Sequence, residues 1–290
     1  MRHSEAALAT EDGATLWVRD WQPEEAPPRA AGVLVHGLGE HGGRYEHLAR
    51  RLTDAGYALD AFDLRGHGRS SGRRGDTRIE PALGDVERLL ARAGARHPGL
   101  PLFLYGHSLG ALVVLTALVR RRPRVAAAIL SAPPLRNALR EQRVKVLLAR
   151  ALGGLLPWLT LRAGLEAAAL SRDPGVVAAY LADPLVHGSA SLGLARDSLA
   201  ATEAVESACD LALPLLILHG GADRIAYPAG SRALAARLAG DVSLREYPGL
   251  FHEPHNEPER DAVIEDAIAW LDARVGPRAA ASPGGRRMAP

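Results

Sequence analysis

Three side chains far apart in the chain, a serine, an aspartate and a histidine, have the types needed for nucleophilic attack on an acyl group. Ser108 lies in Gly106-His107-Ser108-Leu109-Gly110, Asp223 follows the apolar run 215–218, and His252 follows the run 242–247. A serine hydroxyl is a poor nucleophile at neutral pH, so an imidazole must take its proton and a carboxylate must orient that imidazole. The sequence therefore contains the parts of a Ser-His-Asp triad.

The flanks of the serine support this interpretation. Residues 101–105 are typical of a buried strand, and residues 111–119 are typical of a helix packed on a core. A tight turn between them would strain the serine backbone and lift its hydroxyl clear of the sheet. Glycines at 106 and 110 would let the strand and the helix approach closely. The pattern G-x-S-x-G also occurs in ordinary loops, so the prediction depends on this context.

Each partner of the serine has a simpler alternative. Asp223 by itself could be a loop carboxylate that bonds its own backbone, and His252 could be an ordinary loop histidine with His255 as a rival. The chain order Ser, Asp, His is that of nucleophile-elbow enzymes and differs from the order in other triad folds. This order, together with the position after the last predicted strand, favours His252 over His255.

An oxyanion formed by attack on the acyl carbon needs two hydrogen-bond donors. The backbone N–H of Leu109, directly after the serine, would supply one. The turn after the strand 32–36 would supply the other, which we assign to the N–H of Leu38. Both are backbone contributions, so the two leucine side chains say little about catalysis.

Apolar strands alternate with helices along most of the chain. We expect strands at 15–21, 32–36, 57–63, 102–105, 125–130, 213–218 and 242–247, and helices at 45–55, 79–92, 111–119, 229–238 and 259–275. This alternation requires crossover connections, which predicts an α/β fold with a mainly parallel, doubly wound sheet. Ligands of such sheets bind beyond the carboxyl ends of the strands, where the predicted triad stands.

The alternation stops between residues 135 and 208, which are rich in Ala, Leu and Arg and are expected to be helical without a strand. We therefore divide the chain into an α/β core (1–134 and 209–275), a helical cap (135–208) and a disordered tail (276–290). The apolar segment 144–161 is interrupted by charges, glycines and a proline, so it is too broken to span a bilayer. It is either core packing or a lid that docks on lipid. We expect three leucines of this segment, Leu155, Leu156 and Leu159, to bind substrate.

Composition narrows the class of protein. The 290 residues carry a net charge of +2, and 35 basic and 33 acidic side chains are spread along the chain, so nothing indicates nucleic-acid binding. The single Cys209 cannot form an internal disulfide, and the N-terminus lacks an apolar signal segment. We expect a cytoplasmic protein whose membrane contact, if any, is peripheral. The oligomeric state is left open.

Two other groups of polar residues could be taken for catalytic or metal-binding residues, but their spacing does not support either role. Asp63 and Arg65 follow a predicted strand, but their glycine-rich surroundings favour a network that shapes a loop. The histidines at 36, 41, 67 and 219 lack the paired short spacings of zinc ligands. We therefore expect no metal site.

Six motifs occur together along the chain: His36-Gly37-Leu38-Gly39-Glu40-His41 with Arg44-Tyr45, Asp63-Leu64-Arg65-Gly66-His67-Gly68-Arg69-Ser70, the serine motif, Ser131-Ala132-Pro133, Asp183-Pro184-Leu185 and His219-Gly220-Gly221-Ala222-Asp223. Together they resemble the monoacylglycerol lipase and lysophospholipase branch of the α/β-hydrolases. The resemblance covers residues 14 to about 271. The first string is fairly specific to this branch, whereas the others fit α/β-hydrolases generally, including prolyl-type aminopeptidases and perhydrolases.

The resemblance implies a serine hydrolase with a helical cap that forms a lipophilic acyl tunnel, without metal or organic cofactor. The implied reaction cleaves a single-chain lipid ester, monoacylglycerol to fatty acid and glycerol, through an acyl-enzyme. The alternatives are a lysophospholipase, a general carboxylesterase, a serine aminopeptidase and a catalytically silent receptor with this fold, although such receptors usually lack the serine or the histidine. Aspartate-nucleophile dehalogenases and epoxide hydrolases are excluded if Ser108 is the elbow residue. The Ala-rich cap with few aromatics departs from the family, which leaves acyl length open.

Overall fold

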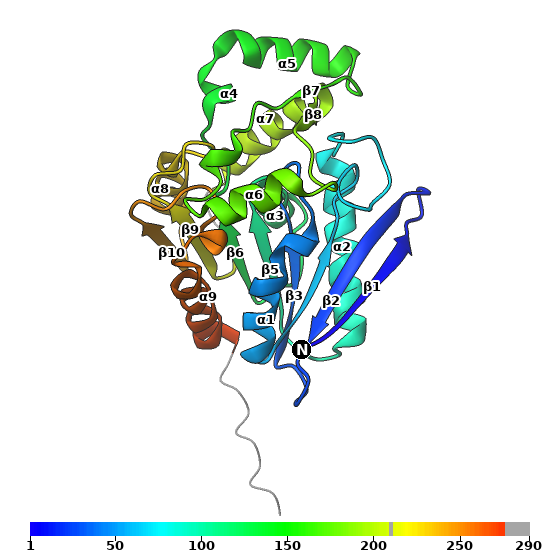
Figure 1. The fold of residues 1–290 in the computed structure, drawn as a ribbon, viewed down its shortest axis with the longest axis vertical. Coiled ribbons are helices and arrows are strands. Elements are labelled where there is room, and N and C mark those ends of the chain that lie inside the picture. Colours follow the sequence, from blue (N-terminus) through cyan, green and yellow to red (C-terminus); the bar gives the residue numbers. More distant parts are fainter. Residues whose placement is uncertain (209–210, 276–290) are drawn as a thin grey trace, which may run out of the picture.

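The computed structural model describes residues 1–208 and 211–275, so Cys209 and the predicted disordered tail (276–290) lie outside the described residues. One main sheet has the order β1-β2-β4-β3-β5-β6-β9-β10 (Figure 1). Its strands are β1 (Arg2–Ala9), β2 (Thr15–Gln22), β3 (Ala30–Val35), β4 (Tyr57–Phe62), β5 (Leu102–His107), β6 (Ala127–Ser131), β9 (Leu215–Gly220) and β10 (Val242–Tyr247). Neighbours from β4 to β10 pair in parallel, whereas β1 with β2 and β2 with β4 pair antiparallel. The predicted α/β fold is confirmed.

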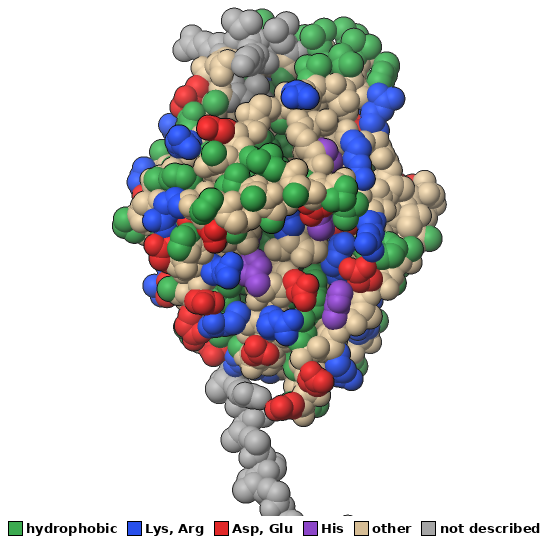
Figure 2. Space-filling model, in the orientation of Figure 1, with side chains coloured by type: hydrophobic (Ala, Val, Ile, Leu, Met, Phe, Trp, Pro, Cys, Tyr) green, Lys and Arg blue, Asp and Glu red, His purple; other side chains and the backbone are tan. Residues whose placement is uncertain are grey.

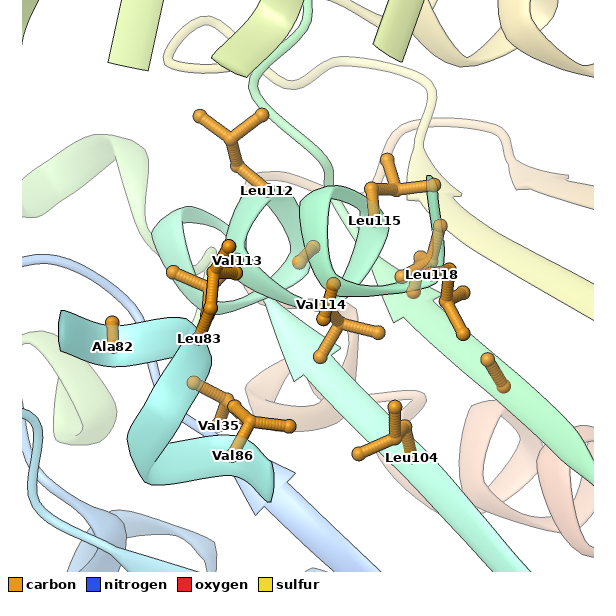
Figure 3. Packing of buried hydrophobic residues seen from close by; sticks show 14 of the residues in the cluster. Val35, Ala82, Leu83, Val86, Leu104, Leu112, Val113, Val114, Leu115 and Leu118 are labelled. Carbon is orange, nitrogen blue, oxygen red and sulfur yellow. The ribbon is translucent and has the colours of Figure 1, made fainter. Parts of the chain in front are cut away.

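Helices cover both faces of this sheet. Buried residues of α2, α3 and α8 form a core with one face, and those of α1 and α9 form a core with the other. Figure 3 shows Leu83 and Val86 of α2, Val113 of α3, Val35 of β3 and Leu104 of β5 in the first core. The bounds are α1 (Glu46–Asp54), α2 (Ile79–Arg96), α3 (Leu109–Arg120), α8 (Pro228–Arg237) and α9 (Arg260–Val275).

The central strands are easy to recognise because both of their faces are buried. Every residue of β3, β4, β6 and β9 is buried, and their sequences are nearly continuous apolar runs, as expected for a parallel sheet covered by helices. The edge strand β1 was not predicted, because nearly all of its residues are exposed and it has no apolar face. Only its pairing with β2 makes it a strand.

Residues 135–208, which we call the cap segment, lie above the sheet in Figure 1. They contain α4 (Ala138–Glu141), α5 (Arg143–Leu155), the 3-10 turn η2 (Ala167–Ala169), α6 (Pro174–Ala182) and α7 (Leu192–Ser207). The expectation that the segment holds no strand is wrong, because β7 (Thr160–Arg162) and β8 (Ser189–Ser191) pair antiparallel. Strands this short show no periodicity, and their partner is distant in sequence. The domain boundaries stay a prediction.

Backbone hydrogen bonds attach the cap segment to loops at the carboxyl ends of the strands. The N–H of His187 donates to the Gly39 carbonyl and that of Ser191 to the Gly75 carbonyl, each at 2.8 Å. Side chains add a fork from Arg78 to Asp197, at 2.8 and 3.1 Å. The loops that carry the predicted site are therefore in direct contact with the cap segment.

Candidate active site

The strand-to-helix turn at Ser108 has the strained geometry expected from its sequence. Ser108 stands between β5 and α3 with φ 50° and ψ −119°, a region that residues with a Cβ rarely occupy. Its N–H donates to the Ser131 carbonyl at 2.9 Å. A Cβ at Gly110 would collide with the carbonyl oxygens of Val35 and His36. Glycine at that position therefore lets α3 begin directly against the sheet.

The three predicted triad residues form one hydrogen-bonded chain. Ser108 Oγ lies 2.9 Å from His252 Nε2, and His252 Nδ1 lies 2.7 Å from Asp223 Oδ2. The other carboxylate oxygen of Asp223 accepts the N–H groups of Ile225 and Ala226 at 2.8 and 3.0 Å. This bonding holds the carboxylate so that one oxygen faces the imidazole. The geometry fits proton transfer from the serine hydroxyl to His252.

The charges around His252 suit a general base. Burial opposes protonation of His252, but the neighbouring Asp223 carboxylate outweighs burial and raises the pKa of His252 above its ordinary value. Burial likewise opposes ionisation of Asp223, yet the charge of His252 and the hydrogen bonds from His219 and His252 hold the pKa of Asp223 well below its usual range. The aspartate is therefore ionised at neutral pH and stabilises the imidazolium formed during proton transfer.

The turn after β3 lies against the serine, as an oxyanion-binding turn must. A Cβ at Gly37 would stand 3.2 Å from the Cβ of Ser108. The N–H of Gly37 is already used, because it donates to Glu40 Oε1 at 2.7 Å. Within residues 1–208 and 211–275, the N–H groups of Leu38 and Leu109 have no acceptor. They remain the proposed oxyanion donors.

His255, the rival of His252, is buried beside the site and takes no part in the hydrogen-bonded chain. Its ring stacks on Tyr45 with centroids 4.9 Å apart and meets the edge of His107 at 4.7 Å. Neither ring nitrogen has a hydrogen-bond partner in the described part of the chain. Burial lowers the pKa of His255 to about 3, so its ring is neutral.

Asp63 and Arg65 shape the loop after β4, as expected, but through separate partners. The Asp63 carboxylate accepts the N–H groups of Gly42 and Arg69 at 2.9 and 2.8 Å and pairs with Arg19 at 2.6 Å. Arg65 forms a fork with Asp85. No group of three or more His, Cys, Asp or Glu among the described residues is arranged to hold a metal ion.

An ion cluster that residue spacing along the chain does not predict lies next to His252. Arg44 donates to Glu40 and forms a two-bond fork with Glu253, which directly follows His252. Glu40 and Arg44 belong to the first string of the family resemblance, but neither that string nor the spacing of Glu253 indicates an ion pair between them. A carboxylate next to the predicted catalytic histidine was the available signal.

The predicted substrate-binding leucines lie on the outside of the cap segment. Leu155 is 72% exposed, and Leu156 and Leu159 are 39% and 41% exposed. Figure 2 shows hydrophobic side chains gathered at the top of the molecule near the end of α5. Because these side chains face outward, their contact with substrate stays a prediction.

Known proteins resemble most of the chain. Residues 26–259 match the family described as serine aminopeptidase, S33. The chain is 40% identical to a monoacylglycerol lipase of Mycolicibacterium smegmatis (92% of this chain, 96% of the relative) and 34% identical to human monoglyceride lipase (95% and 93%). The crystal structure of a Paleococcus ferrophilus monoacylglycerol lipase is 34% identical, with a TM-score of 0.81, and the match covers 94% of this chain and 99% of that one.

Proposed function

The chain belongs to the α/β-hydrolase family described as serine aminopeptidase, S33, and from this premise we propose that it hydrolyses monoacylglycerols to fatty acid and glycerol. The chemistry is that of a carboxylic ester hydrolase, and the similar proteins from Mycolicibacterium smegmatis and human are named monoacylglycerol lipase and monoglyceride lipase. The family description, serine aminopeptidase, names a different substrate class. A substrate panel is therefore part of the test.

The proposed mechanism has two steps through an acyl-enzyme. His252 Nε2 takes the proton of Ser108 Oγ as the oxygen attacks the ester carbon. The resulting oxyanion accepts the N–H groups of Leu38 and Leu109, and His252 then donates its proton to the leaving glycerol oxygen. In the second step His252 activates a water molecule, which attacks the acyl carbon and releases the fatty acid. Asp223 orients the imidazole and stabilises its charged form throughout.

The observation that carries this proposal is the hydrogen-bonded chain Ser108–His252–Asp223, with distances of 2.9 and 2.7 Å, in which Ser108 itself has a positive φ. A fluorophosphonate probe should label the wild type and leave Ser108→Ala unlabelled. Equal labelling of the two proteins would remove the serine hydrolase mechanism. Among monoacylglycerols, lysophospholipids and aminoacyl amides, we expect monoacylglycerols to have the highest kcat/KM. A higher kcat/KM for an aminoacyl amide would show that the enzyme is an aminopeptidase.

We also propose that the cap segment docks on the lipid that holds the substrate. Large apolar side chains around the end of α5 are exposed, and we call them the apolar patch: Leu147, Leu152, Leu155, Leu156, Trp158, Leu159 and Leu161. Exposed apolar surface gathered in one place favours an interaction site. No described helix is long and apolar enough to cross a membrane, so docking by the patch would be peripheral.

Docking can be measured by sedimentation with vesicles of zwitterionic phospholipid containing monoacylglycerol. We expect the wild type to sediment with the vesicles and Trp158→Ser to sediment less. Equal sedimentation of the two proteins, or none of either, would show that the patch does not bind lipid.

A further inference from the structure

A buried ion cluster connects the turn after β3 to the loop that carries His252. Arg44 donates from its two terminal nitrogens to the two carboxylate oxygens of Glu253, each at 2.7 Å. The same guanidinium donates to Glu40 Oε2 at 2.5 Å. None of the three side chains is more than 10% exposed. One arginine therefore bridges two carboxylates from opposite sides of the site.

Each end of the bridge lies one residue away from a group that the proposed mechanism uses: Glu40 accepts the N–H of Gly37, next to Leu38, and Glu253 is next to His252. Glu40 Oε1 accepts the N–H of Gly37 at 2.7 Å and the Tyr45 hydroxyl at 2.6 Å. The bond from Gly37 holds the turn after β3 in shape. The next N–H in this turn, that of Leu38, has no acceptor among the described residues and is the proposed oxyanion donor. At the other end, Glu253 follows His252 in the chain and also accepts from Asn256 Nδ2 at 2.7 Å. The bridge therefore joins the turn that carries Leu38, which we call the oxyanion turn, to the loop that carries His252, which we call the His252 loop.

Stability alone is a weak reason to keep this cluster. Removing charges from water is costly, and well-packed apolar residues often stabilise a core as well as a buried ion pair does. A planar guanidinium held by two carboxylates defines distance and direction, which a lysine cannot reproduce. The cluster is therefore better explained by the geometry that it imposes on the two loops.

We propose that Arg44 is a positioning residue that fixes the oxyanion turn and the His252 loop relative to each other by bridging Glu40 and Glu253. The inference rests on the proposed function, because it presupposes that Ser108 is the nucleophile and that both loops serve it, one with the oxyanion donor Leu38 and the other with the base His252. It adds a residue that touches neither Ser108 nor the reacting ester and acts through its two neighbours.

The charges near His252 provide a second measurable property. The cluster contains one cation and two carboxylates, and Glu253 and Glu40 add to the effect of Asp223 in raising the pKa of His252. The rings of His107 and His255 also pack in this region, and burial lowers the pKa of each, so both are neutral. Catalysis needs neutral His252, so the rate is lost as the pH falls through the pKa of His252.

Three variants separate geometry from charge. Arg44→Lys keeps the charge and loses the fork. The double variant Arg44→Gln with Glu253→Gln removes the bridge and keeps the net charge of the cluster. Glu253→Gln removes one negative charge. As a control, Arg65→Lys breaks another two-bond fork, which joins the partly exposed Arg65 to the buried Asp85 at 2.7 and 2.8 Å.

The measurement is the rate constant for reaction of Ser108 with a fluorophosphonate as a function of pH. At the optimum, Arg44→Lys and the double variant should react about 10- to 100-fold more slowly than the wild type, as expected for small misplacement of reacting groups. The acidic limb of their pH–rate profile should lie at the same pH as in the wild type. In Glu253→Gln the acidic limb should move to lower pH, because a carboxylate that favours the imidazolium is gone.

Arg65→Lys should keep the wild-type rate. Wild-type rates in both Arg44→Lys and the double variant would overturn the positioning role, and so would an equal loss in Arg65→Lys. An acidic limb of Glu253→Gln that does not move would show that the cluster has no electrostatic contact with His252. A wild type that is not labelled at Ser108 would instead overturn the proposed function, so the two failures are distinct.

Discussion

The triad and the apolar patch differ in how their side chains are held. Asp223 and His252 are buried, and each is tied by hydrogen bonds to side chain and backbone. Even the N–H groups of His252 and Glu253 donate to the cap segment, to the carbonyls of Ala169 and Leu170 at 3.4 and 2.8 Å. In contrast, Leu155 is 72% exposed at the end of α5, a helix that packs chiefly on α7 and α4.

The difference follows from what each region has to do. Proton transfer and oxyanion binding need donors and acceptors already in place, because reorganising them during the reaction would raise the barrier. Recognition of an acyl chain or a lipid surface needs apolar area and tolerates movement of that area. Because the triad is held by hydrogen bonds and the apolar patch is exposed, we predict that changes in the two regions affect different kinetic properties.

The largest effect should come from removing the base of the triad. We expect His252→Ala to lower turnover by about a thousandfold or more, because a triad without its imidazole keeps only oxyanion stabilisation and binding. His255→Ala should change turnover much less, since that ring is outside the hydrogen-bonded chain. Turnover of both variants on a short soluble ester is the measurement. A larger loss of turnover in His255→Ala than in His252→Ala would show that the catalytic base in the loop after β10 is assigned wrongly.

A smaller and selective effect is expected at the patch. Replacing Leu155 and Leu156 by Asp should lower kcat/KM for a long-chain monoacylglycerol by about tenfold or more and change hydrolysis of a short soluble ester little, because each buried methylene contributes about 0.8 kcal/mol. Leu181→Asp is the matched control, because Leu181 is 69% exposed on α6 and lies outside the patch. Equal losses on both esters, at an unchanged melting temperature, would leave the patch without a role in substrate selection.

The smallest effect concerns pH. Because Asp223 raises the pKa of His252, the acidic limb of the kcat/KM profile of the wild type should lie above about 6.5, the ordinary histidine value. Activity should be lost as the pH falls through that limb, since the protonated imidazole cannot accept the serine proton. The patch variants should show the same limb. An acidic limb below pH 6.5 in the wild type would contradict the raised pKa of His252. An acidic limb that shifts when Leu155 is replaced would contradict the separation of the two regions.

Much of the fold was predictable because the central strands are buried on both faces. Strands β3 to β6 and β9 are apolar runs, and each lies within a few residues of its predicted position. The elbow was predictable for a similar local reason, because glycines at 106 and 110 are required wherever a helix begins this close to a strand. Edge strand β1 and the pair β7 and β8 were not, because exposed or very short strands depend on partners remote in sequence.

The sequence by itself determined the types and chain order of Ser108, Asp223 and His252, the glycines around the serine and the alternation of strand and helix. These are properties of the linear sequence, and none of them depends on which residues meet in space. The tertiary structure alone decided that Ser108 Oγ and His252 Nε2 stand 2.9 Å apart, that Arg44 joins Glu40 to Glu253, and that Leu155 faces outward. Each of these depends on where separate loops meet in space, which spacing along the chain does not specify.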